Sequence, residues 1–186
     1  EIRLSLVGSE MCIRDRYNAF LEHKDSFHLM KTIMANYILE GIYFYSGFMF
    51  FYNLGRMGKM SGSAQEIRYI NRDENTHLWL FRNMIIELQK EEPTLFTPEK
   101  IEVYRNMLKR GVEEEIAWGQ YVLGNRIEGL TMDMVSDYIH YLGNLRAFSL
   151  NFEPLYEGFE TEPEAMKWVS IYSNANNLSL IHISEP

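Results

Sequence analysis

Two glutamates and a histidine are the residues in this sequence best suited to chemistry, because each lies where a helix should be apolar. Glu40 shares one helical face with Ile33, Tyr37, Phe44, Phe48 and Phe51. Glu74 and His77 share a second face with Ile67, Ile70, Leu78, Phe81 and Ile85. A carboxylate buried on such a face is costly unless it is paired or bound to a cation. Burial of all three together therefore predicts a metal site.

The spacing of the three residues predicts that they lie at one height in a helical hairpin. A turn-rich segment centred on Gly58 separates the two helical patterns. Counted from Gly58, Glu40 lies eighteen positions back. Glu74 and His77 lie sixteen and nineteen positions forward. With a rise of about 1.5 Å per residue, an antiparallel helix pair brings all three level. Residues three apart also project from one side of a helix, as two ligands of one ion must.

The three residues amount to half of a known type of site. Carboxylate-bridged di-iron and di-manganese bundles use one Glu from each of two helices and a Glu-x-x-His from each of two others, and this chain supplies one of each. The alternative is a buried hydrogen-bonded pair of Glu74 and His77, which leaves Glu40 unexplained. Asp25 and His28 are too close to Glu40 to belong to a separate full-length helix, and we interpret them as a helix start or loop.

The rest of the pattern predicts an all-α chain with short breaks. Helices are expected over about 26–54, 63–90, 97–123 and 132–147, followed by an irregular segment from 151 to 164. Thr97 and Thr131 are the predicted N-caps of the last two helices. The three acidic residues of segment 113–115 are interpreted as a partly solvated helix face.

Composition bounds the classes of function. A chain of 186 residues with 46% hydrophobic residues predicts one domain with a substantial core. The net charge of −8 argues against a nucleic-acid partner. The longest apolar run, 42–54, is too short for a membrane span, so no membrane is expected. The only cysteine, Cys12, allows no disulfide framework, and a reducing cytoplasm is the expected location.

The two ends of the chain differ from the rest. Residues 1–16 and 178–186 resemble translated sequencing-adapter sequence, and the chain opens on Glu1 rather than Met. We expect these ends to be non-native and to flank a helical domain of residues 17–177, truncated at both ends.

Several segments resemble one family: 39–48, 70–78, 115–119, 141–146 and 168–174. They are similar to the class I ribonucleotide reductase small subunit, the radical-generating beta chain, and the Arg72-Asp73-Glu74 run followed by His77 is the most specific part. The resemblance implies a ferritin-like helical bundle that uses two metal ions and oxygen to generate an oxidant. It implies dinuclear iron, manganese or a mixed iron–manganese pair as cofactor. It also implies a homodimer of small subunits and a large alpha subunit, to which the oxidant passes for the reduction of ribonucleotides.

The resemblance also implies roles for individual positions. Three of the family's six metal ligands correspond to Glu40, Glu74 and His77. Asp73 corresponds to an aspartate of the electron-transfer route, and its alternative interpretation is a surface carboxylate. The apolar wall of the radical site corresponds to Phe44, Phe48 and Ile70, for which the alternative is plain core. The family's other ligands, radical tyrosine and C-terminal tail have no counterpart here, so the chain alone is expected to be inactive.

Two other functions stay open at this point. Another carboxylate-bridged di-metal oxidase would use the same ligand types and would have a pocket for its own substrate. A metal-free helical interaction protein would bind no metal.

Overall fold

The computed structural model describes residues 5–173, and over that range it is helical and contains no strand. The helices are α1 (Ser5–His23), α2 (Ser26–Gly41), α3 (Tyr45–Arg56), α4 (Ser61–Glu91), α5 (Pro98–Val122), α6 (Met132–Ser149) and α7 (Lys167–Ser173). Two short 3-10 helices, η1 (Pro93–Phe96) and η2 (Glu164–Met166), lie before α5 and α7. The predicted all-α class is confirmed.

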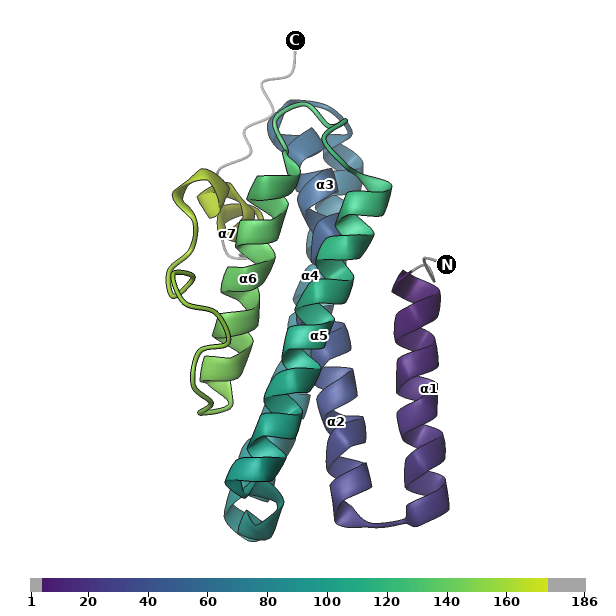
Figure 1. Ribbon diagram of the computed structural model, residues 1–186. Coiled ribbons are helices and arrows are strands. Elements are labelled where there is room, and N and C mark those ends of the chain that lie inside the picture. The colour runs from purple at the N-terminus through teal and green to yellow at the C-terminus, as the bar shows by residue number, and fades with distance from the viewer. Residues whose placement is uncertain (1–4, 174–186) are drawn as a thin grey trace.

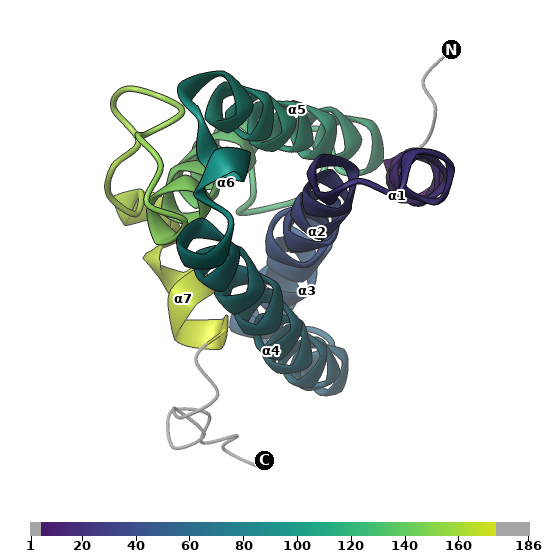
Figure 2. The ribbon, with the colours of Figure 1, turned by 90° about the horizontal axis from the view of Figure 1, so that it is seen from below.

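The helices form an elongated bundle (Figures 1 and 2). α3 continues roughly in the direction of α2, and α4 runs back alongside both of them. α5 and α6 form a second antiparallel pair that packs against α2 and α3, while α1 lies at the edge of the bundle beside α2. The α2–α3 and α4 arms thus form the hairpin that the sequence predicts.

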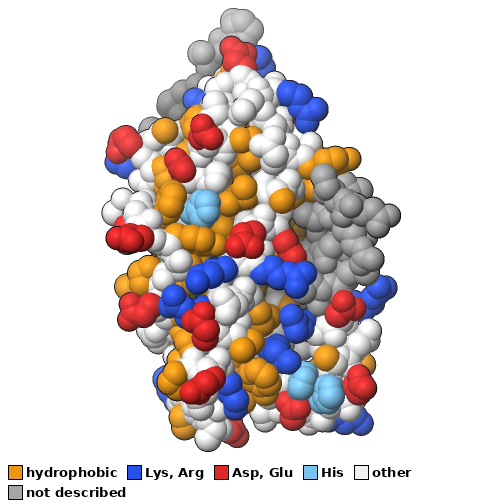
Figure 3. Space-filling view, in the orientation of Figure 1, with side chains coloured by type: hydrophobic (Ala, Val, Ile, Leu, Met, Phe, Trp, Pro, Cys, Tyr) orange, Lys and Arg blue, Asp and Glu red, His pale blue; other side chains and the backbone are white. Residues whose placement is uncertain are grey.

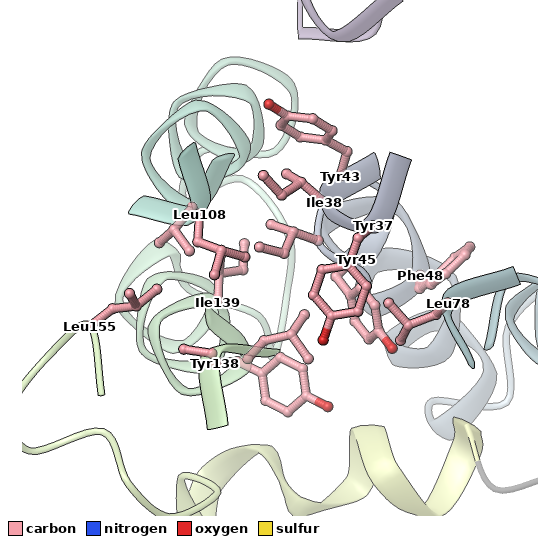
Figure 4. Close-up of a cluster of buried hydrophobic side chains, with 14 of the residues drawn as sticks. Tyr37, Ile38, Tyr43, Tyr45, Phe48, Leu78, Leu108, Tyr138, Ile139 and Leu155 are labelled. Atoms are coloured by element: carbon pink, nitrogen blue, oxygen red, sulfur yellow. The ribbon is translucent and has the colours of Figure 1, made fainter. Parts of the chain in front are cut away.

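The core lies where α2, α5 and α6 meet. Figure 4 shows Leu108 of α5 and Ile139 of α6 opposite Ile38 of α2, with the rings of Tyr45 and Tyr138 beside them. Leu108 and Ile139 are completely buried. Burial of such apolar side chains stabilises the fold by about 1.5–3 kcal/mol for each large side chain. This packing fixes α2, which carries Glu40, against two helices from later in the chain.

The predicted helix over 26–54 is wrong in one respect, because the chain breaks between Gly41 and Tyr45. The remaining predicted helices agree with α4, α5 and α6 within a few residues at each end. No proline marks the break in the sequence. Its stability comes instead from side chains of α5 and α6, which the local pattern does not show.

The residues predicted at the N-termini of three helices differ in whether they cap the helix. Asp25 caps α2 by accepting a hydrogen bond from the backbone N–H of His28 at 2.9 Å, which confirms a helix start. Thr131 caps α6 by accepting from the N–H of Met134 at 3.3 Å. Thr97 occupies the N-cap position of α5, but its side chain makes no capping bond. The N-cap prediction for Thr97 is therefore correct in position and wrong in mechanism.

The surface gives no sign of a membrane-spanning element among residues 5–173, since none of the helices there combines the length and apolar character that a bilayer requires. Figure 3 shows acidic, basic and hydrophobic side chains interspersed on one face of the molecule. The irregular segment predicted over 151–164 is present as a chain of turns before η2.

The predictions about the chain ends stay predictions. Segment 178–186 lies outside the described residues, as do residues 1–4. The backbone from Ser5 onward belongs to α1.

Candidate metal centre

Glu40, Glu74 and His77 converge, although they come from two helices. One potential ligand atom from each lies within 4.8 Å of the others. The Nδ1 atom of His77 lies 3.0 Å from Oε2 of Glu74 and 3.9 Å from Oε2 of Glu40. The matched heights about Gly58 thus correspond to a real meeting of side chains, because α4 runs antiparallel to α2 and α3.

The three side chains differ in exposure. The side chains of Glu40 and Glu74 are 13% and 19% exposed, whereas that of His77 is 55% exposed. The prediction that all three are buried together is therefore wrong for His77. The apolar positions that share its face of α4 differ in exposure, since Ile70 is 45% exposed whereas Leu78 and Ile85 are buried. Within the described residues, no helix covers this side of α4.

The environment of Glu40 disfavours a bare negative charge. Burial, followed by the hydrogen bond and the negative charge of Glu74, raises the pKa of Glu40 to about 7, while His77 opposes that shift. Two carboxylates this close cannot both ionise freely unless a positive charge lies between them. A bound cation would take the place of the proton.

The donor set fits a divalent transition metal. Two carboxylates and one imidazole offer oxygen and nitrogen ligands, which suit iron and manganese. An anion site is excluded, because the two carboxylates would repel any anion. The geometry thus supports metal binding at Glu40, Glu74 and His77, and their assignment as ligands stays a prediction.

Asp73 lies next to Glu74 in the sequence but does not join the cluster. Its side chain is 67% exposed, and the Nε atom of Arg72 lies 3.5 Å from its Oδ1. An ion pair this exposed contributes little to stability. Asp73 is therefore a surface carboxylate within the described residues, and its role in electron transfer stays a prediction.

The three predicted pocket-wall residues are not equally enclosed. Phe48 is 4% exposed and Phe44 is half-buried, and their rings stack with centroids 6.0 Å apart. Ile70, in contrast, is 45% exposed. Phe44, at the N-cap position of α3, and Phe48, within α3, supply apolar surface, whereas Ile70 is open to solvent in this structure.

Two functional candidates were missed by the sequence pattern. Glu115 was placed on a partly solvated face, but its side chain is completely buried in the structure. Arg146 is also buried, at 9% exposure, and the sequence pattern predicts no function for it. One signal was available for Glu115: it lies four positions after Gly111 and four before Gly119, which marks a face of close helix packing.

The comparisons with known proteins point to one family. The sequence profile of the family "Ribonucleotide reductase, small chain" matches residues 8–163. The chain is 62% identical over 171 residues to the ribonucleoside-diphosphate reductase subunit beta of Treponema pallidum, which covers 92% of this chain and 49% of that protein. It is 37% identical over 165 residues to the subunit of the same name from Halalkalibacterium halodurans, covering 89% of this chain and 47% of that protein. The chain thus spans about half the length of the curated relatives it matches.

Solved structures agree with this similarity. The fold superimposes on the ribonucleotide reductase R2 subunit from Clostridium botulinum with a TM-score of 0.84 and 46% sequence identity. The match covers 91% of this chain and 53% of that one. The predicted ferritin-like helical fold is confirmed. These similarities favour the reductase subunit over the other di-metal oxidases and over a metal-free interaction protein.

Proposed function

Because the chain belongs to the ribonucleotide reductase small-chain family, we propose that it acts within the small subunit of a class I ribonucleoside-diphosphate reductase. The observation that carries this proposal is the convergence of Glu40, Glu74 and His77 from α2 and α4. A chance Glu-x-x-His on one helix would not also meet a carboxylate from another helix. Membership of the family and the donor set therefore support the same chemistry.

In this proposal Glu40, Glu74 and His77 supply part of the protein ligands of a dinuclear metal cofactor. The cofactor, formed by iron, manganese or both, would supply one-electron oxidation driven by dioxygen when it is bound. The Nδ1 atom of His77 faces Oε2 of Glu74 at 3.0 Å, so this nitrogen and that carboxylate could bind the same metal ion. Glu40 holds a proton near neutral pH and would release it as a cation takes its place.

The apolar residues near the proposed ligands would control the access of water to the site. In this proposal the half-buried Phe44 and the buried Phe48 would keep the surroundings of Glu40 dry, and a dry environment protects a one-electron oxidised group from quenching. Asp73, on the exposed side of α4, is available for contact with another part of the protein or with a partner. We assign it to the electron-transfer route on the strength of the family pattern.

The partners follow from the same proposal. The relatives are named as beta subunits of a reductase, which supports a large alpha subunit as partner. A homodimer of small subunits belongs to the family's organisation. The product of the assembly would be deoxyribonucleotides.

The experiment that tests this function uses a full-length small subunit containing this chain, together with its large subunit. Glu74→Ala and His77→Ala should abolish stable dinuclear metal binding and reductase turnover, because each removes a ligand. Glu87→Ala is the matched control, since Glu87 lies on the same helix and forms only an exposed ion pair with Lys90. Full metal content and undiminished turnover in the two ligand variants would overturn the assignment.

A further inference from the structure

The chain breaks directly after Glu40, and side chains from two other helices bind the two ends of the break. Gly41, the last residue of α2, accepts a hydrogen bond at its carbonyl oxygen from Nε of Arg146 at 3.0 Å. Ser46, in the first turn of α3, donates its N–H to Oε1 of Glu115 at 2.8 Å. A cation at a helix C-terminus matches the partial negative charge of that end, and the carboxyl oxygen of Glu115 accepts from one of the free N–H groups in the first turn of α3.

Arg146 of α6 forms hydrogen bonds with two residues in the last turn of α2. Besides the bond to Gly41, its backbone carbonyl accepts a hydrogen bond from the Tyr37 hydroxyl at 3.0 Å. Tyr37 and Gly41 lie on either side of Glu40 in the sequence. Nη2 of Arg146 also donates to the Tyr45 hydroxyl at 3.1 Å, which ties the first residue of α3 to the same side chain. Arg146 thus connects both helix ends.

Glu115 of α5 supplies the cap that α3 itself lacks. The residue at the N-cap position of α3, Phe44, provides no side-chain hydrogen bond. Glu115 is completely buried, and its Oε2 atom has no hydrogen-bond partner among the described residues. Burial raises the pKa of Glu115 to about 8. An apolar side chain here would avoid the cost of burying a carboxyl group but would leave the Ser46 N–H without an acceptor.

Glycines provide the space for both contacts. A Cβ atom at Gly119 would lie 2.9 Å from Oγ of Ser46, and one at Gly111 would lie 2.5 Å from Cγ2 of Ile38. These glycines flank Glu115 on one face of α5, so α5 can approach the break closely. A Cβ atom at Gly41 would lie 3.0 Å from Nε of Arg146.

We propose that Glu115 and Arg146 are positioning residues, which hold the α2–α3 break and thereby fix the direction in which Glu40 faces Glu74 and His77. Neither side chain belongs to the converging ligand group. Both act on Glu40 through the backbone of the turn that carries it. The inference rests on the proposed function where it treats Glu40 as a metal ligand.

The test compares variants of the 186-residue chain. Glu115→Ala removes the cap of α3, and Arg146→Met removes the guanidinium group but keeps a long side chain. Glu115→Gln is the conservative variant, because its amide oxygen can still accept from Ser46. Leu108→Ala is the matched control, since it creates a cavity in the core of α5 without touching the break.

Two measurements are made on each variant, together with its free energy of unfolding. The first is the affinity for Mn²⁺, followed by the paramagnetic resonance signal of the free ion. The second, in the metal-free chain, is the ¹³C chemical shift of the Glu40 side-chain carboxyl group, which reports its surroundings. Glu115→Ala and Arg146→Met should weaken Mn²⁺ binding by about tenfold, as loss of groups that orient a metal ligand does. Both should also shift the Glu40 resonance. Glu115→Gln should keep the wild-type Mn²⁺ affinity and the wild-type Glu40 resonance.

The inference is overturned if Glu115→Ala and Arg146→Met change the Mn²⁺ affinity and the Glu40 resonance no more than Leu108→Ala does. The comparison is made at a similar loss of unfolding free energy. Should Glu115→Ala or Arg146→Met fail to fold, Arg146→Lys decides. Arg146→Lys has one ammonium group in place of the separate Nε and Nη2 donors to Gly41 and Tyr45, so unchanged values in it count against the inference. Absence of Mn²⁺ binding in the wild-type chain would count against the proposed metal site instead, and the metal-free Glu40 resonance would still decide the role of the break.

Discussion

Oε2 of Glu40 lies 3.9 Å from Nδ1 of His77, although the two residues come from different helices and from opposite arms of a hairpin. The hairpin turn near Gly58, the antiparallel course of α4 and the packing of α2 against α5 and α6 all contribute to that approach. Glu74 completes the group through its own hydrogen bond to His77.

Replacement of Glu74 should stabilise the metal-free fold. Glu74→Gln removes a negative charge beside Glu40, and we expect a gain of about 1 kcal/mol at pH 8, a modest value because solvent screens part of the repulsion. Since the pKa of Glu40 is raised to about 7, Glu40 is protonated at pH 5 and the gain should disappear there. Urea unfolding of both proteins at the two pH values measures the effect. An equal change at pH 5 and pH 8 would show that charge repulsion is not the cause.

Glu115 should make stability depend on pH. Its pKa is raised by burial from 4.5 to about 8, so the folded state binds this proton more tightly than the unfolded chain does. Its contribution is present in full below pH 4.5 and is lost as the pH rises through 8, with a total on the order of 2 to 5 kcal/mol. Glu115→Gln cannot titrate, so its unfolding free energy should fall less between pH 5 and pH 8. Parallel curves for the variant and the wild type would contradict the assignment.

Gly111 should not tolerate a methyl group. Gly111→Ala places a Cβ atom 2.5 Å from Cγ2 of Ile38, and we expect a loss of about 1–3 kcal/mol in unfolding free energy from overpacking. Gly62→Ala is the control, because nothing lies within 4 Å of its added Cβ and alanine favours a helix by about 1 kcal/mol over glycine. Thermal unfolding of the two variants should therefore shift in opposite directions. Equal stability of the variants would mean that α5 does not pack as closely on α2 as described.

The open side of α4 should drive association. Leu80 is 51% exposed and Met84 is 39% exposed, near the face that carries His77. Residues four apart are neighbours on a helix surface, and exposed apolar side chains that lie together promote contact with other molecules. Leu80→Lys should shift the chain toward monomer in sedimentation velocity measurements at high concentration. The exposed Glu66→Lys, on the same helix, is the control for a change of charge. A monomeric wild-type chain at the same concentration would contradict this prediction.

The sequence was sufficient for the parts of the fold that depend on local pattern. The spacing of Glu40, Glu74 and His77 about Gly58 predicted their convergence, because helix rise and the antiparallel hairpin are regular. The cap at Thr131 and the start at Asp25 followed from side chains that bond to their own neighbours. The exposure of His77 could not be predicted, since Leu78 and Ile85 on the same face of α4 are buried and the pattern does not separate them from His77.

The break between α2 and α3 could not be predicted from local pattern either. It contains aromatic and apolar residues that continue a helix in other contexts, and its hydrogen bonds reach Arg146 and Glu115, far along the chain. The acidic run 113–115 predicts a partly solvated helix face, whereas the side chain of Glu115 is completely buried. Its burial follows from the close approach of α5, which the flanking glycines permit.

The most direct test of the central claim is to locate the metal in crystals of the small subunit grown with Mn²⁺ or Fe²⁺. Anomalous difference maps recorded above and below the absorption edge of the metal identify its position independently of the protein density. We expect the peak between the Glu40 and Glu74 carboxylates and the His77 imidazole, within about 2.0–2.3 Å of at least one atom of each. A fully occupied metal elsewhere, with these three side chains uncoordinated, would contradict the account.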